Sequence, residues 1–237
     1  MTTIQRLRIS FDYENRPHFL YPTVLFGKKE TVLIDLGYPG FLPLLEEALE
    51  KEGIRPEDIT TIVLTHHDDD TIGAAWEWQR KYPHVTFAAS ELEARYIEGL
   101  EERPRIVQAD QIIQLMDEAE REMGQEWRDA LARVPGVRID RFLKEGDVLD
   151  WGGECHVLET PGHTPGHLSF YLPNDNIVIA ADAAMQERDY ITIVDMQLSI
   201  DVERAAKSLE RIIALDPDEI ICYHTGSFTK EANNRNE

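Results

Sequence analysis

A polar loop that carries three potential metal ligands within five residues constrains this chain more than any other feature. Residues 59–64 form an apolar, β-branched run without helix breakers, which predicts a buried strand. His66, Asp68 and Asp70 follow at alternate positions in the loop that runs to Gly73. A rigid strand end can aim several short side chains at one point, as a metal ion requires. The loop therefore predicts half of a metal site.

Three later segments repeat the arrangement of an apolar strand that ends on a histidine or an aspartate. His163 lies in the Pro/Gly-rich turn 160–167, after the strand-like residues 155–158. Asp182 ends the apolar run 177–181, and His224 follows the run 220–223. A metal ion needs ligands from more than one segment to be held in shape. The four strand ends together predict one metal site assembled from distant parts of the chain.

The first of these motifs resembles that of the metallo-β-lactamase superfamily of metallohydrolases. In words, the family motif is Thr-His-any-His-any-Asp-His-any-Gly. This chain keeps the first histidine as His66, the aspartate as Asp70 and the glycine as Gly73. Asp68 stands where the second histidine is usual, and Thr71 stands where the third is usual. These two differences from the family motif change the expected ligands of the metal site.

The later motifs extend the resemblance to nearly the whole chain, because they match at His163, Asp182 and His224. Residues 33–37 also resemble a family element near the metal site, whose aspartate, here Asp35, is usually structural. The resemblance implies an α/β fold, a four-layer αββα sandwich. Strands and helices that recur in two similar halves suit the same architecture.

The resemblance implies two metal positions that share a bridging carboxylate, Asp182. The first would take His66, Asp68 and His163, and the second would take Asp70, Asp182 and His224. Asp68 is a charged oxygen ligand, which makes manganese or iron more competitive with zinc. The alternative role for Asp68 is a carboxylate that supports a ligand without binding the metal itself.

Thr71 is expected to weaken the second position. A neutral hydroxyl is a poor ligand for a borderline metal, so this position keeps three protein ligands. That number still suits a catalytic ion with bound water. The expected cofactor is one or two divalent transition metals, with zinc favoured over manganese and iron.

Four neighbouring residues are not expected to bind metal. We interpret His67 and Asp69 as supporting residues or as solvent-facing ones, because they alternate with the ligands. His167 is expected to pack within its turn, and Cys222 to be a buried strand residue.

These ligands predict a hydrolase. A bound metal lowers the pKa of water to roughly 7, and the hydroxide would attack an ester, lactone, thioester or similar bond of a small molecule. Asp70 is the expected catalytic residue, which orients the hydroxide and takes up its proton. Two alternatives are an iron-dependent oxidoreductase of the same fold and a metal-poor binding protein with reduced catalysis.

Composition restricts the partners and the compartment. The net charge of −21 argues against binding to nucleic acid or to anionic membranes. The sequence has no apolar run long enough to span a membrane and no charged N-terminal segment followed by an apolar one. Two cysteines are too few for a disulfide framework, so a cytoplasmic location is expected. A length of 237 residues suits a single domain, residues 1–237.

Residues 99–136 differ from the rest of the chain. Apolar residues recur there every three or four positions between Pro104 and Pro135, which predicts one amphipathic helix or two that meet near Gly124. We expect this helical insertion to form a lid over the active site or a contact in a homodimer, with extra core as the alternative.

Periodicity and turn signals predict the remaining elements. Strands are expected at residues 4–11, 19–26, 31–34, 59–64, 85–89, 137–142, 148–151, 155–158, 168–172, 177–181 and 219–223. Helices are expected at residues 39–52, 72–82 and 199–215, with another that begins at Ser90. The polar residues 231–237 are expected to be frayed.

Overall fold

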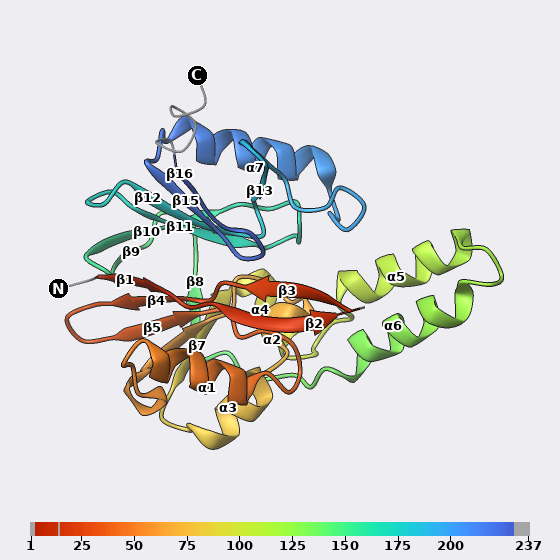
Figure 1. Ribbon diagram of the computed structural model, residues 1–237, viewed down its shortest axis with the longest axis horizontal. Coiled ribbons are helices and arrows are strands. Elements are labelled where there is room, and N and C mark those ends of the chain that lie inside the picture. The colour runs from red at the N-terminus through yellow and green to blue at the C-terminus, as the bar shows by residue number, and fades with distance from the viewer. Residues whose placement is uncertain (1–2, 14, 230–237) are drawn as a thin grey trace.

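The computed structural model describes residues 3–13 and 15–229, and within them two six-stranded sheets lie face to face. Helices cover the outer face of each sheet (Figure 1). This is the four-layer αββα arrangement, so the predicted fold class is confirmed. No helix in these residues is both long and apolar enough to cross a membrane.

The first sheet has the order β1-β4-β5-β6-β7-β8. Its strands are β1 (Ile4–Arg6), β4 (Thr23–Phe26), β5 (Thr31–Ile34), β6 (Thr61–Val63), β7 (Thr86–Ser90) and β8 (Arg141–Leu143). Strands β5 to β8 are parallel, so their carboxyl ends meet at one edge of the sheet. The outer face is covered by α1 (Leu42–Lys51) and α3 (Ala75–Lys81) (Figure 1).

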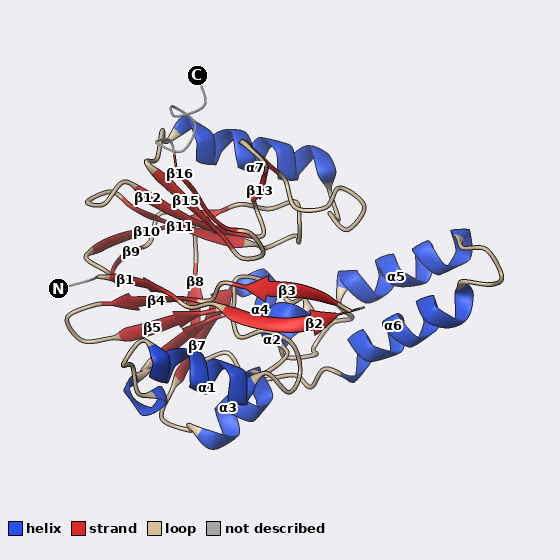
Figure 2. Cartoon of the chain, viewed as in Figure 1, coloured by secondary structure: helices blue, strands red, loops and turns tan. Residues whose placement is uncertain are grey.

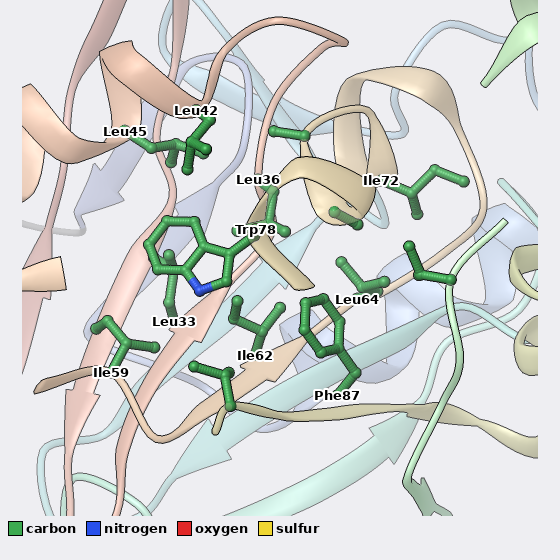
Figure 3. Packing of buried hydrophobic residues seen from close by; sticks show 14 of the residues in the cluster. Leu33, Leu36, Leu42, Leu45, Ile59, Ile62, Leu64, Ile72, Trp78 and Phe87 are labelled. Carbon is green, nitrogen blue, oxygen red and sulfur yellow. The ribbon is translucent and has the colours of Figure 1, made fainter. Parts of the chain in front are cut away.

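Strand alternation divides the apolar residues of this sheet between two cores. Leu33 and Ile62 face the helices, where they belong to the same buried cluster as Trp78 of α3 (Figure 3). Val32 and Val63 face the opposite way, into the core between the sheets. Both faces are therefore buried, which is why β5 and β6 have continuous apolar sequences.

The second sheet has the order β16-β15-β12-β11-β10-β9. Its strands are β9 (Val148–Asp150), β10 (Glu154–Glu159), β11 (Leu168–Leu172), β12 (Ile177–Ala181), β15 (Glu219–Cys222) and β16 (Gly226–Thr229). Strands β12 and β15 are parallel, so the residues that follow them leave the sheet on the same side. The helix α7 (Val202–Ala214) covers the outer face and buries Ile212 with Val178 and Ile220.

Several short elements complete the chain. They are the hairpins β2 (Ile9–Tyr13) with β3 (Arg16–Leu20) and β13 (Met185–Glu187) with β14 (Tyr190–Thr192), the turn η1 (Pro56–Asp58), and the helices α2 (Asp69–Ile72) and α4 (Glu91–Ile97). The expected strands 4–11 and 19–26 are each divided in two, because the chain leaves the first sheet to form the β2–β3 hairpin. Strands β13, β14 and β16 were not predicted, and residues 231–237 lie outside the described part.

The metal-motif loop is not extended throughout, contrary to the alternation expected from the sequence. The expected helix 72–82 is instead two pieces, and α2 begins within the motif at Asp69. Gly73 ends α2 where a Cβ atom would lie 2.2 Å from the Pro39 nitrogen. Only glycine fits this close approach of α2 to the loop before α1.

Residues 99–136 contain a helical hairpin, α5 (Pro104–Leu115) and α6 (Arg121–Arg133). It projects from the sandwich (Figure 2) and buries Ile106, Ala109 and Leu131 in a small core of its own. The two helices meet at residues 116–120, and the prediction of a break near Gly124 is wrong. Gly124 lies inside α6, where a Cβ atom would lie 2.7 Å from Met116 Sδ, so glycine there allows the helices to pack closely.

Candidate metal centre

Four loops bring the predicted ligands together at the carboxyl ends of the parallel strands. His66, Asp68 and Asp70 follow β6, His163 lies in the turn between β10 and β11, and Asp182 and His224 follow β12 and β15. The first three come from one sheet and the others from the second. In the turn, Gly162 has φ 140° and lies so close to Ala205 of α7 that any side chain would clash. The centre therefore lies where the two sheets and α7 converge.

Asp182 lies at the middle of the cluster. Its Oδ2 is 3.2 Å from His224 Nε2, 3.6 Å from His66 Nε2 and 3.7 Å from His163 Nε2. Its Oδ1 is buried and has no hydrogen-bond partner among the described residues. A buried carboxylate oxygen without a partner is costly, unless a cation binds it.

Asp70 adds a second carboxylate beside His224, with Oδ2 3.1 Å from His224 Nε2. One ligand atom each from His66, Asp70 and Asp182 lie within 4.8 Å of one another. The same holds for His66, Asp68 and His163. The structure therefore brings all six predicted ligands into one cluster, with His66 in both groups.

Arg105, from the first turn of α5, is part of this cluster and was not predicted. Its Nε donates to both oxygens of Asp68 at 3.0 and 3.1 Å, and its Nη2 donates to Asp68 Oδ2. Nη2 also lies 3.2 Å from His163 Nε2. Nη1 donates to Gln108 Oε1 and to the Leu198 carbonyl oxygen. The guanidinium is buried, and each of its three nitrogens donates at least one hydrogen bond.

A chain of hydrogen bonds holds the His66 ring at Nδ1, the nitrogen that faces away from the centre. Thr65 Oγ1 donates to Asp35 Oδ2 at 2.9 Å, so its oxygen accepts from His66 Nδ1, also at 2.9 Å. The Thr65 N–H donates to the other oxygen of Asp35. This arrangement places the proton on Nδ1 and directs Nε2 toward the centre. Thr71 Oγ1 lies 3.3 Å from the same Nε2 atom.

His167 supports Asp182 rather than binding metal. His167 Nε2 accepts from the Asp182 N–H at 3.2 Å, so Nδ1 carries the proton and donates to Thr160 Oγ1. The chain continues through Ser169 to the Ala180 carbonyl oxygen. Burial and the neighbouring His66 and His163 hold the pKa of His167 well below its usual value. The ring is therefore neutral and packs in its turn as expected.

Glu93 of α4 joins the two motif loops and was not predicted as a site residue. Its Oε2 lies 2.5 Å from His67 Nδ1, and its Oε1 accepts from Thr164 Oγ1 at 2.8 Å and from the Gly166 N–H at 2.7 Å. Ser90 caps α4 by accepting from the Glu93 N–H, as the sequence indicated. His67 is fully buried, so it is a supporting residue and not a solvent-facing one.

Burial and neighbouring charges shift the pKa values of several residues in the cluster. Burial opposes the charged form of His66, but the hydrogen bond to Asp68 and the charges of Asp68, Asp182 and Asp70 outweigh it and raise the pKa of His66 to about 9. Burial would raise the pKa of Asp182, yet His224, His163 and His66 hold it well below its usual range. Burial and two neighbouring carboxylates raise the pKa of Asp69 to about 7. The centre is thus rich in negative charge that favours a cation.

Cys222 is buried in β15, as predicted. Its side chain packs with the α7 side of the sheet, and burial raises the pKa of its thiol to about 12. Thiolate is the form that binds metal, so this residue is poorly suited to be a ligand.

The two positions differ in how well their donors fit a metal ion. At one of them, His66, Asp70 and Asp182 each offer one ligand atom within 4.8 Å of the others, and His224 Nε2 lies within 3.2 Å of both carboxylates. Asp182 Oδ1 has no hydrogen-bond partner among the described residues. This set suits zinc, manganese or iron. At the other position, Asp68 and His163 are already engaged by Arg105.

Comparisons with known proteins identify the family of this chain. A hydroxyacylglutathione hydrolase of Rhodopseudomonas palustris (strain BisB5) is 32% identical over 145 residues, which cover 61% of this chain and 40% of that protein. One from Rhizobium meliloti (strain 1021) is 29% identical over 88% of this chain and 62% of its own length. The matches thus span less than two thirds of these relatives.

A metallo-beta-lactamase family protein from Thermus thermophilus has the same fold, with a TM-score of 0.73 and 21% identity over all of this chain and 80% of its own. The family model described as the metallo-beta-lactamase superfamily matches residues 18–224, which include every residue of the cluster. The chain therefore belongs to the metallo-β-lactamase superfamily.

Proposed function

We propose that this protein is a metal-dependent hydrolase that cleaves an ester, lactone or thioester bond in a small molecule. The observation that carries the proposal is the buried, unpartnered Asp182 Oδ1 among three imidazoles and a second carboxylate, Asp70, within the described residues. The names of the relatives support it, since they include hydroxyacylglutathione hydrolase and a probable metallo-hydrolase of Bacillus subtilis, which is 25% identical over 81% of this chain.

His66, Asp70, Asp182 and His224 would hold the ion. Such an ion supplies a water molecule with a pKa near 7 and polarises a carbonyl oxygen. Asp70 is the residue that accepts the proton of the attacking water and passes it to the leaving oxygen or sulfur. Thr65 and Asp35 keep the His66 ring in its working tautomer, while His167 fixes the backbone of Asp182.

The substrate class follows from charge and from the relatives. The net charge of −21 disfavours nucleic acid and anionic membranes as partners, which supports a small molecule as the proposed substrate. Hydroxyacylglutathione, the substrate named for the relatives, is an acyl conjugate of a small thiol. Zinc is the proposed metal, with manganese or iron as alternatives because the set is half carboxylate.

Hydrolysis of three probes tests this proposal: p-nitrophenyl acetate, a γ-lactone and a hydroxyacylglutathione. Protein purified without chelator should cleave at least one of them, lose the activity with its metal, and regain it when zinc or manganese returns. Asp70→Asn should lower kcat by about 10²- to 10⁴-fold, as expected for loss of a general base. Asp150→Asn, an exposed change at the far end of β9, is the matched control.

Metal-loaded protein that cleaves none of the three probes would contradict the proposal. Activity that survives complete metal removal would contradict it as well. Iron in the purified protein, together with oxygen-dependent turnover, would support the oxidoreductase alternative instead.

A further inference from the structure

The guanidinium of Arg105 contacts Asp68 and His163, the two side chains that a metal ion at the first position would need as ligands. An ion there would bind Asp68 and His163 at about 2.0 to 2.2 Å. Arg105 Nη2 already donates to Asp68 Oδ2 and lies 3.2 Å from His163 Nε2. His163 Nε2 also lies 3.0 Å from Asp68 Oδ2. Whichever tautomer His163 adopts, its Nε2 is engaged, either as an acceptor from Arg105 or as a donor to Asp68.

The hydrogen bonds at Nδ1 of His66 and of His163 also indicate that only His66 is a metal ligand. A histidine that binds metal usually donates its other ring nitrogen to a fixed acceptor. His66 Nδ1 has one in Thr65 Oγ1, which is itself bound to Asp35. His163 Nδ1 is buried and has no partner among the described residues. His66 is therefore built as a ligand, whereas His163 is not.

Hydrogen bonds to uncharged groups also hold Arg105 in place. Its Nη1 binds Gln108 and the Leu198 carbonyl oxygen, and Gln108 Nε2 donates to the Gln197 carbonyl oxygen at 3.1 Å. Nearby, Arg103 donates to the carbonyl oxygens of Leu131 and Val134, which anchors the base of the α5–α6 hairpin. The guanidinium is thus fixed from both the hairpin and the loop before α7.

The three carboxylates that contact Arg105 or His224 match one metal ion and one guanidinium in charge. Asp68, Asp70 and Asp182 contribute three negative charges, and Arg105 with one divalent ion contributes three positive charges. A second divalent ion between Asp68 and His163 would lie close to a buried guanidinium that cannot lose its proton, so the two positive charges would repel each other.

We propose that Arg105 permanently replaces one metal ion of the centre, so that the protein binds a single divalent ion through His66, Asp70, Asp182 and His224. Asp68 is then the partner of Arg105 and not a ligand. This reverses the order expected from Thr71 alone, because the first position is closed and the second is the occupied one. The inference rests on the proposed function only in assuming that a metal binds.

Metal stoichiometry tests the inference. The unmodified protein, loaded with excess zinc and separated from free ions, should contain one zinc per chain by elemental analysis. Arg105→Gln removes the charge and frees Asp68 and His163, so its content should rise toward two. Arg128→Ala, which removes a hairpin arginine paired with Asp110 away from the centre, should stay at one. Two tightly held ions in the unmodified protein would overturn the inference, whether or not Arg105→Gln folds.

Ligand variants provide a second readout in the same assay. His224→Ala should lose most of the zinc, whereas His163→Ala and Asp68→Asn should retain it. Loss of zinc in His163→Ala with retention in His224→Ala would place the ion at the first position and overturn the inference. Neither result measures hydrolysis, so a zinc count that contradicts the inference leaves the proposed function intact. Conversely, inactivity toward all three probes would not contradict a count of one zinc per chain.

Discussion

Thr65 shows how much a single hydroxyl contributes to the centre. The residue precedes the histidine of the motif, and its Oγ1 lies between Asp35 and His66, 2.9 Å from each. Asp35 itself has φ 64°, a left-handed conformation that is uncommon for residues other than glycine. Burial raises the pKa of Asp35 to about 7, although His66 and Thr65 oppose that shift. The bonds from Thr65 therefore help to keep the carboxylate ionised.

Thr65→Val should weaken zinc binding by about 10- to 100-fold, because His66 loses the acceptor that fixes its tautomer. Competition with a chelating dye measures the affinity. Thr61→Val is the matched control, since Thr61 is equally buried in β6 but bonds Glu30, away from the centre. Equal zinc affinity in the two variants would contradict the role assigned to Thr65.

At the scale of the secondary-structure element, helix α4 connects two ligand-bearing loops through the side chain of Glu93. Glu93 lies in its first turn, where it contacts the β6 loop through His67 and the β10–β11 turn through Thr164 and Gly166. These loops carry ligands from opposite sheets. Burial would raise the pKa of Glu93, but His67 lowers it below its usual value. The ionised carboxylate therefore contributes to the stability of the fold.

Glu93→Gln should lower the free energy of unfolding by about 1 to 3 kcal/mol, since an amide cannot accept all three hydrogen bonds. Because the folded-state pKa is depressed, the contribution is present above the unfolded pKa of Glu93 and is lost as pH falls through the folded pKa. Urea unfolding at pH 7 and at pH 4 measures it, with the exposed Glu91→Gln as control. A difference between the two variants that is no larger at pH 7 than at pH 4 would count against this account.

At the scale of the whole molecule, the centre joins the two halves of the sandwich. His66 and Asp70 follow a strand of the first sheet, while Asp182 and His224 follow strands of the second. Apolar side chains such as Val63 and Phe170 form the core between the two sheets. A bound ion would therefore link both sheets and stabilise only the folded state.

Zinc at about 100 times its Kd should raise the free energy of unfolding by ~2.7 kcal/mol and Tm by roughly 5 to 10 °C. Thermal unfolding with zinc and with chelator measures the shift. His224→Ala, which removes a proposed ligand from the second sheet, should show little of it. A full zinc-dependent shift in that variant would mean that the stabilising ion binds elsewhere.

Local pattern alone determined several central strands and the motif residues. The bounds of β5, β11 and β12 were predicted without error, because a continuous apolar run between turn residues depends only on neighbours in the chain. The order of His and Asp residues at strand ends likewise indicated the family and the cluster, since parallel strands must end at one edge.

Only the tertiary structure decided that Arg105 pairs with Asp68 and that Glu93 supports the loops that carry the ligands. Arg105 lies 37 residues from Asp68, and Glu93 lies 71 residues from Thr164, in helices whose sequences carry no sign of these contacts. A buried arginine on an amphipathic helix is indistinguishable from an exposed one by periodicity. Its partner is fixed only when the hairpin docks, because the cost of burying both charges is offset only by their contact across the fold.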